Sequence, residues 1–168
     1  MKKGNIVALI PVKENSDRVK RKNLRKFGKT NLLELKLEQL KKVKGFNKII
    51  ISSESEYILN IASTYKFEIH KRHPKYSTSK VPMSEVYRYI ASEIEGDFIA
   101  WVNITNPLAT SKIYQRAIST FKKLDKKYDC LLSAYKIQEN LYYKNKRVNF
   151  PRSPWPRSQD LIPVYSLS

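Results

Sequence analysis

The chain has 168 residues, of which 41% are hydrophobic and 11% are aromatic, and its formal net charge is +18. This length and composition predict a single folded domain over 1–168 and exclude a disordered chain. A single cysteine excludes an intrachain disulfide framework and a cysteine-based zinc cluster. Because Cys130 lies in an apolar run, we expect a buried structural thiol. The N-terminal run is too short and too strand-like for a signal peptide or a membrane span, which predicts a cytoplasmic protein.

The positive charge has two interpretations. Most of the basic residues are lysines spread over the predicted helices, which favours a solvated basic surface. The same charge is also typical of nucleic-acid binding. The segment 13–29 stands apart, because it holds eight Lys or Arg residues against two acids. Such a cluster suits a polyanionic ligand such as a nucleoside triphosphate.

Apolar runs alternate with amphipathic segments through the first four fifths of the chain. A strand over 5–10 leads into the basic loop 13–29, and a helix follows over 31–44. The later predicted elements are a strand over 49–52, a helix over 53–65 capped by Ser53, a strand over 67–70, a helix over 83–94, a strand over 97–102, a helix over 111–124 and a strand over 129–134. This alternation predicts an α/β, Rossmann-like three-layer fold with a mostly parallel sheet. Ligands of such sheets bind at the carboxyl ends of strands, which is where the basic loop begins.

The pattern changes after Ala134. Residues 135–148 are polar and aromatic, with a hairpin turn predicted at 144–146, and residues 151–157 are too rich in proline for regular structure. We interpret 135–157 as an inserted arm that packs on a partner subunit. Residues 162–168 predict a final strand with no helix after it, so the fold is expected to be incomplete at its C-terminal end.

Three segments, in this order, resemble the acylneuraminate (CMP-sialic acid synthetase-like) cytidylyltransferase family. They are 10–16 followed by Lys22 and Asn23, then 71–77, then 102–108. The stretch from Arg157 to Tyr165 is a weaker fourth match, and the resemblance covers essentially the whole chain. It implies a nucleotidyltransferase fold and a homodimer, with 135–157 as the dimerisation element.

The resemblance also implies an activity. The family transfers CMP from CTP to the anomeric hydroxyl of a nine-carbon or related sugar acid and releases pyrophosphate, with Mg²⁺ as the expected cofactor. The family's metal-binding aspartates lie beyond residue 168, so no metal ligand is assigned in this chain. The resemblance therefore leaves two alternatives, a working enzyme and a non-catalytic nucleotide-binding remnant.

Site residues follow from the matched motifs. Lys13 and Lys22 are the expected catalytic pair, because they would neutralise charge on the triphosphate and on the phosphoryl group under attack. The residues assigned to the nucleotide are Asn15, Ser16, Asn23, Arg72 and Ser84. Within that set, Arg72 is expected to read cytosine by donating to its carbonyl oxygen and ring nitrogen. The residues assigned to the sugar acid are Asn103, Thr105, Arg157 and Gln159.

This chain departs from the family at Glu14 and Asp17, which bring acids into the phosphate loop. They weaken phosphate affinity unless they hold Mg²⁺ or pair with Arg18. Two further classes of function stay open. One is another nucleotidyltransferase or a glycosyltransferase on the same fold. The other is a nucleic-acid-binding module that uses residues 13–29 and exposed tyrosines.

Overall fold

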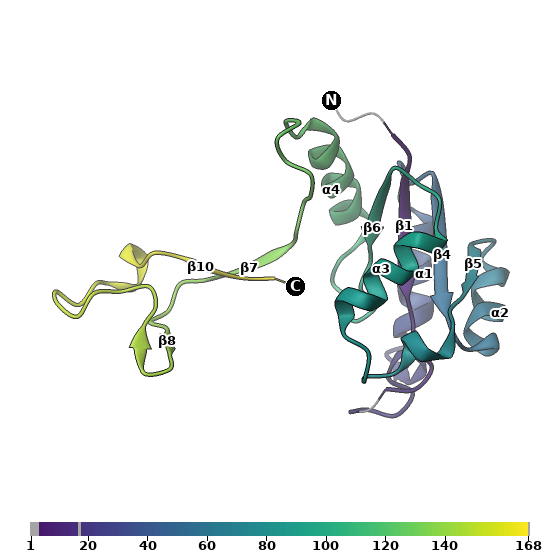
Figure 1. The fold of residues 1–168 in the computed structure, drawn as a ribbon, viewed down its shortest axis with the longest axis horizontal. Helices are drawn as coiled ribbons and strands as arrows, with labels where there is room; N and C mark the ends of the chain where they lie inside the picture. Colours follow the sequence, from purple (N-terminus) through teal and green to yellow (C-terminus); the bar gives the residue numbers. More distant parts are fainter. Residues whose placement is uncertain (1–3, 17, 168) are drawn as a thin grey trace. The chain divides into compact units, whose positions relative to one another are not determined.

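The computed structural model describes residues 4–16 and 18–167. The chain divides into two compact units, residues 1–126 and 127–168 (Figure 1). The first unit contains the parallel sheet and its helices. The arm predicted over 135–157 falls within the second unit.

A four-stranded parallel sheet forms the centre of the first unit. Its strands, in spatial order, are β5 (Glu68–Lys71), β4 (Lys48–Ser53), β1 (Ile6–Pro11) and β6 (Phe98–Trp101). Strand β1 lies between β4 and β6, and its Leu9 is opposite Ile50 on one side and Trp101 on the other. The continuous apolar run of β1 is typical of a parallel strand that is covered on both faces. The predicted α/β fold with a parallel sheet is confirmed.

Helices cover both faces of this sheet and give the unit three layers (Figure 1). They are α1 (Leu32–Lys41), α2 (Glu56–Thr64), α3 (Met83–Glu93) and α4 (Ser111–Lys123). Helices α1, α2 and α4 pack on the face that carries Ala8 and Ile10. Helix α3 covers the opposite face, where its Ile90 packs with Leu9 and Ile50. Alternate residues of β1 therefore enter two different cores, as the two-residue period of a strand requires.

Capping residues mark where two of these helices begin. The side chain of Asn31 accepts a hydrogen bond of 2.9 Å from the backbone amide of Glu34 at the start of α1. The cap of α2 is Ser55, whose Oγ accepts from the amide of Ile58, so the prediction of Ser53 as the cap was wrong. Ser53 is still the last residue of β4, where it pairs with Lys71 of β5.

Short elements complete the first unit. They are the 3₁₀ turns η1 (Lys22–Leu24) and η2 (Pro74–Ser77) and the paired strands β2 (Lys26–Phe27) and β3 (Thr30–Asn31). Among the described helices, none is long and apolar enough to cross a membrane.

The second unit consists of two short antiparallel pairs and a turn. Its elements are β7 (Ala134–Ile137) paired with β10 (Val164–Leu167), β8 (Tyr142–Tyr143) paired with β9 (Lys146–Arg147), and η3 (Ser158–Asp160). Lys144 and Asn145 have positive φ, which confirms the hairpin turn predicted there, and β10 confirms the predicted final strand.

One predicted strand of the second unit was wrong. Residues 129–133 form no strand, and β7 begins only at Ala134, where β10 supplies a partner edge. Cys130 is exposed, so the prediction of a buried thiol was also wrong. Both errors have one cause, since an apolar run becomes a buried strand only if a neighbouring strand pairs with it.

Candidate functional site

A cavity of about 310 Å³ lies where β1 and β6 end. Because neighbouring parallel strands end at the same edge of the sheet, the segments that follow them meet there. The segment after β1 supplies what we call the basic wall: Lys13, Asn15, Ser16, Arg18, Lys22 and Asn23. The segment after β6 supplies what we call the amide wall: Asn103, Ile104 and Thr105. The structure thus brings together most of the predicted site residues.

The basic wall is cationic. Lys13, Arg18 and Lys22 all line the cavity, and its described lining includes no carboxylate. Three cations around one small cavity attract a polyanion such as a triphosphate. Arg18 was not among the predicted site residues. The signal that could have found it is its position between Ser16 and Lys22 in the same loop.

Asn23 is the buried member of the basic wall. Its Nδ2 donates a hydrogen bond of 3.0 Å to the backbone carbonyl of Lys13, which ties the two ends of the loop together. Its Oδ1 is buried and has no hydrogen-bond partner within the described part of the chain. A buried acceptor left without a donor costs about 1–3 kcal/mol. Asn23 also lines the cavity, so this unpaired acceptor lies close to it.

A buried ion pair lies behind the basic wall. The Nη2 of Arg72 is 3.0 Å from Oε2 of Glu54 and donates a 2.8 Å hydrogen bond to the carbonyl of Val12, at the exit of β1. Its Nε donates to Oγ of Ser77, 2.9 Å away. Glu54 in turn accepts from the backbone amide of Glu14 at 3.1 Å. These bonds fix Val12 and Glu14, where the basic loop begins, to the end of the sheet.

Burial raises the pKa of Glu54, but hydrogen bonds from its own backbone amide, from that of Glu14 and from the side chains of Arg72 and Ser77 more than offset this effect. The net result is a lowered pKa, so Glu54 stays ionised and keeps its partner at neutral pH.

Residues 7–155 match the cytidylyltransferase family. This chain belongs to that family. No curated protein matches its sequence.

Several solved structures share the fold of this cytidylyltransferase. A 4-diphosphocytidyl-2C-methyl-D-erythritol synthase from Anaerococcus prevotii matches with a TM-score of 0.67 and 15% identity, over 97% of this chain and 68% of that one. A cytidylyltransferase from Leptospira borgpetersenii matches with a TM-score of 0.55 and 22% identity, over 70% of this chain and 48% of that one. A CMP:2-keto-3-deoxy-manno-octonic acid synthetase complexed with CTP matches with a TM-score of 0.56 and 12% identity, over 70% of this chain and 47% of that one.

The present chain thus spans less than half the length of the last two proteins. At these identities the likeness establishes the fold, whereas the family match establishes the family.

Two residues predicted to bind the nucleotide are not part of the described lining of the cavity, Arg72 and Ser84. The Arg72 side chain is only 2% exposed and already bonds to three protein groups, so the structure gives it a positioning role at the exit of β1. Ser84 is exposed in the first turn of α3. Cytosine recognition by Arg72 stays a prediction.

The acid that departs from the family pattern, Glu14, does not line the cavity. Its Oε2 accepts a 2.5 Å hydrogen bond from Oγ of Ser55, and its Oε1 lies 3.7 Å from Nη2 of Arg21. The carboxylate is therefore directed to the start of α2, where it competes little with a phosphate. The second such acid, Asp17, lies outside the described residues.

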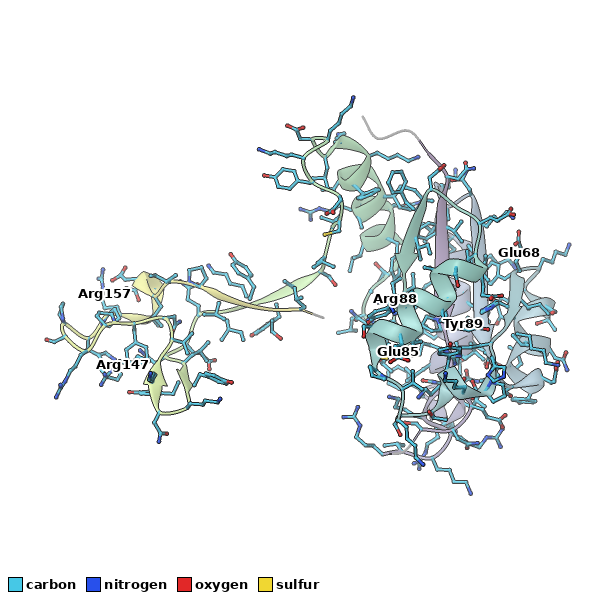
Figure 2. All side chains as sticks on the ribbon, viewed as in Figure 1. Glu68, Glu85, Arg88, Tyr89, Arg147 and Arg157 are labelled. Carbon is cyan, nitrogen blue, oxygen red and sulfur yellow. The ribbon has the colours of Figure 1, made fainter. Side chains whose placement is uncertain are left out.

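Two residues predicted to bind the sugar acid, Arg157 and Gln159, lie in the second unit. Arg157, labelled in Figure 2, forms an exposed ion pair in which its Nε is 2.8 Å from Oδ2 of Asp160. The carbonyl of Gln159 accepts from Nε2 of Gln138 at 3.1 Å. Both bonds stay within the second unit, and the assignment of these residues to the sugar acid stays a prediction.

The described lining of the cavity does not offer a resident Mg²⁺ ion its usual ligands. Magnesium is held by carboxylates and phosphate oxygens, whereas the described lining presents ammonium, guanidinium, hydroxyl and amide groups. Nowhere within residues 4–16 and 18–167 do three or more His, Cys, Asp or Glu side chains gather into a metal site. The cavity as described is therefore built for an anion.

Proposed function

We propose that this member of the cytidylyltransferase family transfers CMP from CTP to a sugar acid of the acylneuraminate type and releases pyrophosphate. One observation carries the proposal. The cavity is lined both by three cations of the basic wall and by Asn103 and Thr105, which follow adjacent strands of the sheet. A triphosphate and a hydroxylated acceptor would each meet suitable groups there.

The reaction is an in-line displacement at the α-phosphate. The sugar hydroxyl oxygen forms a bond to the α-phosphorus, the bond to the oxygen that bridges to the β-phosphate breaks, and pyrophosphate leaves with that electron pair. The hydroxyl proton passes to solvent. Lys13 and Lys22 would stabilise the negative charge that builds up on the phosphoryl oxygens, and the backbone amides of Asn15 and Ser16 would add donors. Catalysis on this account depends mainly on positioning and electrostatics.

The identity of the acceptor rests on two supports. The matched sequence segments resemble enzymes that activate nine-carbon sugar acids, and one similar structure is named as a synthetase for a shorter sugar acid. In the cavity, Asn103 and Thr105 offer amide and hydroxyl groups that suit a polyhydroxylated ligand. Arg157 and Gln159 remain the candidates for its carboxylate or acyl group.

We further propose that the second unit packs on a second copy of the chain. Its large apolar side chains that are exposed to 60% or more are Leu132, Tyr135, Tyr143, Trp155, Ile162, Tyr165 and Leu167. Exposed apolar surface of this kind, on a unit of only 42 residues (127–168), is typical of an interface. Sedimentation equilibrium should show a dimer; a monomer at high micromolar concentration would contradict the proposed partner.

A pyrophosphate-release assay tests the activity. The wild-type protein is expected to release pyrophosphate when it is given CTP, Mg²⁺ and N-acetylneuraminate or 2-keto-3-deoxy-octonate together, and not with CTP alone. Lys22→Ala should abolish this release, because it removes a cation that lines the cavity. Lys20→Ala is the matched control, since Lys20 is an exposed lysine of the same loop that is not part of the lining. Equal activity of the two variants would contradict the role of Lys22.

A further inference from the structure

Lys36 in α1 is a fully buried lysine, with an exposed fraction of 0%. It occupies the same buried helix face as Leu33, Leu37 and Leu40. No carboxylate pairs with it in the described part of the chain. Removing an ammonium group from water without a counter-charge is costly, so its hydrogen bonds must serve the structure around it.

Those bonds all lead away from α1. The Nζ of Lys36 donates to the backbone carbonyl of Asn106 at 2.8 Å and to that of Ala109 at 3.1 Å. It also lies 3.0 Å from the hydroxyl of Tyr114 in α4. An ammonium group has three protons, and each of them meets one acceptor here.

A neighbouring residue of the same helix strengthens this contact. The Nε2 of Gln39, three residues after Lys36, donates to the carbonyl of Pro107 at 2.7 Å. Three carbonyls of the segment 106–109 are therefore held by two side chains of α1. We call this set of bonds the α1 clamp.

The clamped segment continues directly from the amide wall. Thr105 lines the cavity and Asn106 is the next residue. The amide of Asn106 also bonds back to the carbonyl of Asn103 at 3.4 Å, which closes a turn over the wall. A shift of the clamped carbonyls would therefore move the side chains of Asn103 and Thr105 within the cavity.

We propose that Lys36, together with Gln39, is a positioning residue that fixes the amide wall and thereby the binding of the acceptor substrate. The effect on acceptor binding rests on the function proposed above, whereas the fixing of the amide wall does not. Neither side chain lines the cavity, so the clamp acts through the backbone of residues 103–109.

The first test needs no ligand. Lys36→Met keeps the length and apolar stem of the side chain and removes its donors, and Lys41→Met alters an exposed lysine of the same helix. Backbone amides of 103–109 should exchange with deuterium about tenfold faster in Lys36→Met than in Lys41→Met, while those of β1 stay protected in both. Equal exchange over 103–109 in the two variants would overturn the clamp.

Gln39→Leu is a second variant that tests the clamp even if Lys36→Met does not fold. It removes the bond to Pro107 alone, so it should speed exchange in the same segment by a smaller factor. If Lys36→Met does not fold and Gln39→Leu exchanges like the wild type, the clamp is again overturned.

The second test uses turnover. In the pyrophosphate-release assay, Lys36→Met is expected to raise KM for the sugar acid about fivefold or more, with KM for CTP changed less than about twofold, because the basic wall is intact. Lys36→Gln, which keeps two donors, should recover part of this loss. Equal weakening of both substrates, or of neither, would contradict the positioning role. Wild-type protein that does not respond to CTP would contradict the proposed function alone, because the exchange test is still decisive for the clamp.

Discussion

The two walls of the cavity follow neighbouring strands of one sheet, yet they are anchored in different ways. The basic wall is tied down by Arg72, whose charge is balanced by Glu54. The amide wall is tied down by Lys36, which bonds to two carbonyls and a hydroxyl and has no carboxylate partner within the described residues. Because Glu54 balances its charge, Arg72 adds little to the electrostatic potential of the cavity, where the cations of the basic wall would attract phosphate. We therefore expect that the two walls, which are the proposed phosphate and acceptor halves of the site, can be perturbed separately.

The largest effect is expected for Arg72→Met. It breaks a buried ion pair, leaves the Glu54 carboxylate without its partner and removes a donor from Val12, which should cost about 3 kcal/mol of unfolding free energy. Urea denaturation measures this, with Arg88→Met, an exposed arginine of α3, as the control. The double variant Glu54→Gln, Arg72→Met should recover part of the loss. A difference below about 1 kcal/mol between Arg72→Met and Arg88→Met would show that the pair does not anchor the basic wall.

A smaller effect is expected for Lys22→Ala on phosphate binding. Loss of one of three cations should weaken tripolyphosphate binding about tenfold, or about 1.4 kcal/mol, and should reduce its dependence on salt. Titration calorimetry at two salt concentrations measures both. Lys36→Met should bind tripolyphosphate like the wild type, because it alters the other wall. If Lys36→Met loses as much affinity as Lys22→Ala, the two walls do not act separately.

A third effect is the pH dependence that Lys36 contributes. Burial lowers the pKa of Lys36 from 10.5 to about 8, so between these pH values the unfolded chain binds more protons than the folded chain. Stability due to this group should therefore rise as pH increases from about 8 to 10.5. Tyr114, the titratable group that contacts Lys36, stays neutral over this range because burial raises its pKa to about 12. Its hydroxyl can accept from the ammonium or donate to the neutral amine, so the contact survives deprotonation.

The measurement is the difference in unfolding free energy between wild type and Lys36→Met across that range. As pH rises, the unfolding free energy of the wild type should increase relative to that of Lys36→Met. The difference in unfolding free energy between wild type and Lys41→Met should not change with pH. A flat difference for Lys36→Met as well would mean that the buried amine has an ordinary pKa.

Local sequence signals predicted much of this molecule. The apolar run of β1, the basic loop after it and the pair Lys22 and Asn23 together located the basic wall, because strand ends and their loops are neighbours in sequence. The wrong strand over 129–134 shows the limit of local signals, since pairing with a distant edge decided where β7 begins.

The anchors of the two walls depend on contacts between distant residues. Arg72 lies 60 residues from Val12 and 18 from Glu54, and no local pattern links them. Lys36 lies 70 residues from Asn106. A signal for Lys36 was nevertheless present, because it falls on the helix stripe of Leu33, Leu37 and Leu40, where a lysine is out of place.

The most direct test of the account is the thermal stabilisation of wild-type protein by CTP, UTP, ATP and GTP, each with Mg²⁺ at moderate salt. A ligand that binds only the folded state raises the melting temperature by an amount that grows with its concentration relative to its Kd, so the four nucleotides are compared at one concentration. We expect a clear rise with CTP that exceeds the rise with the other nucleotides, is reduced in Lys22→Ala and is kept in Lys20→Ala. Equal small rises with all four nucleotides that vanish at high salt would contradict it, because the cavity would then be a general polyanion patch and nucleic acid the better ligand.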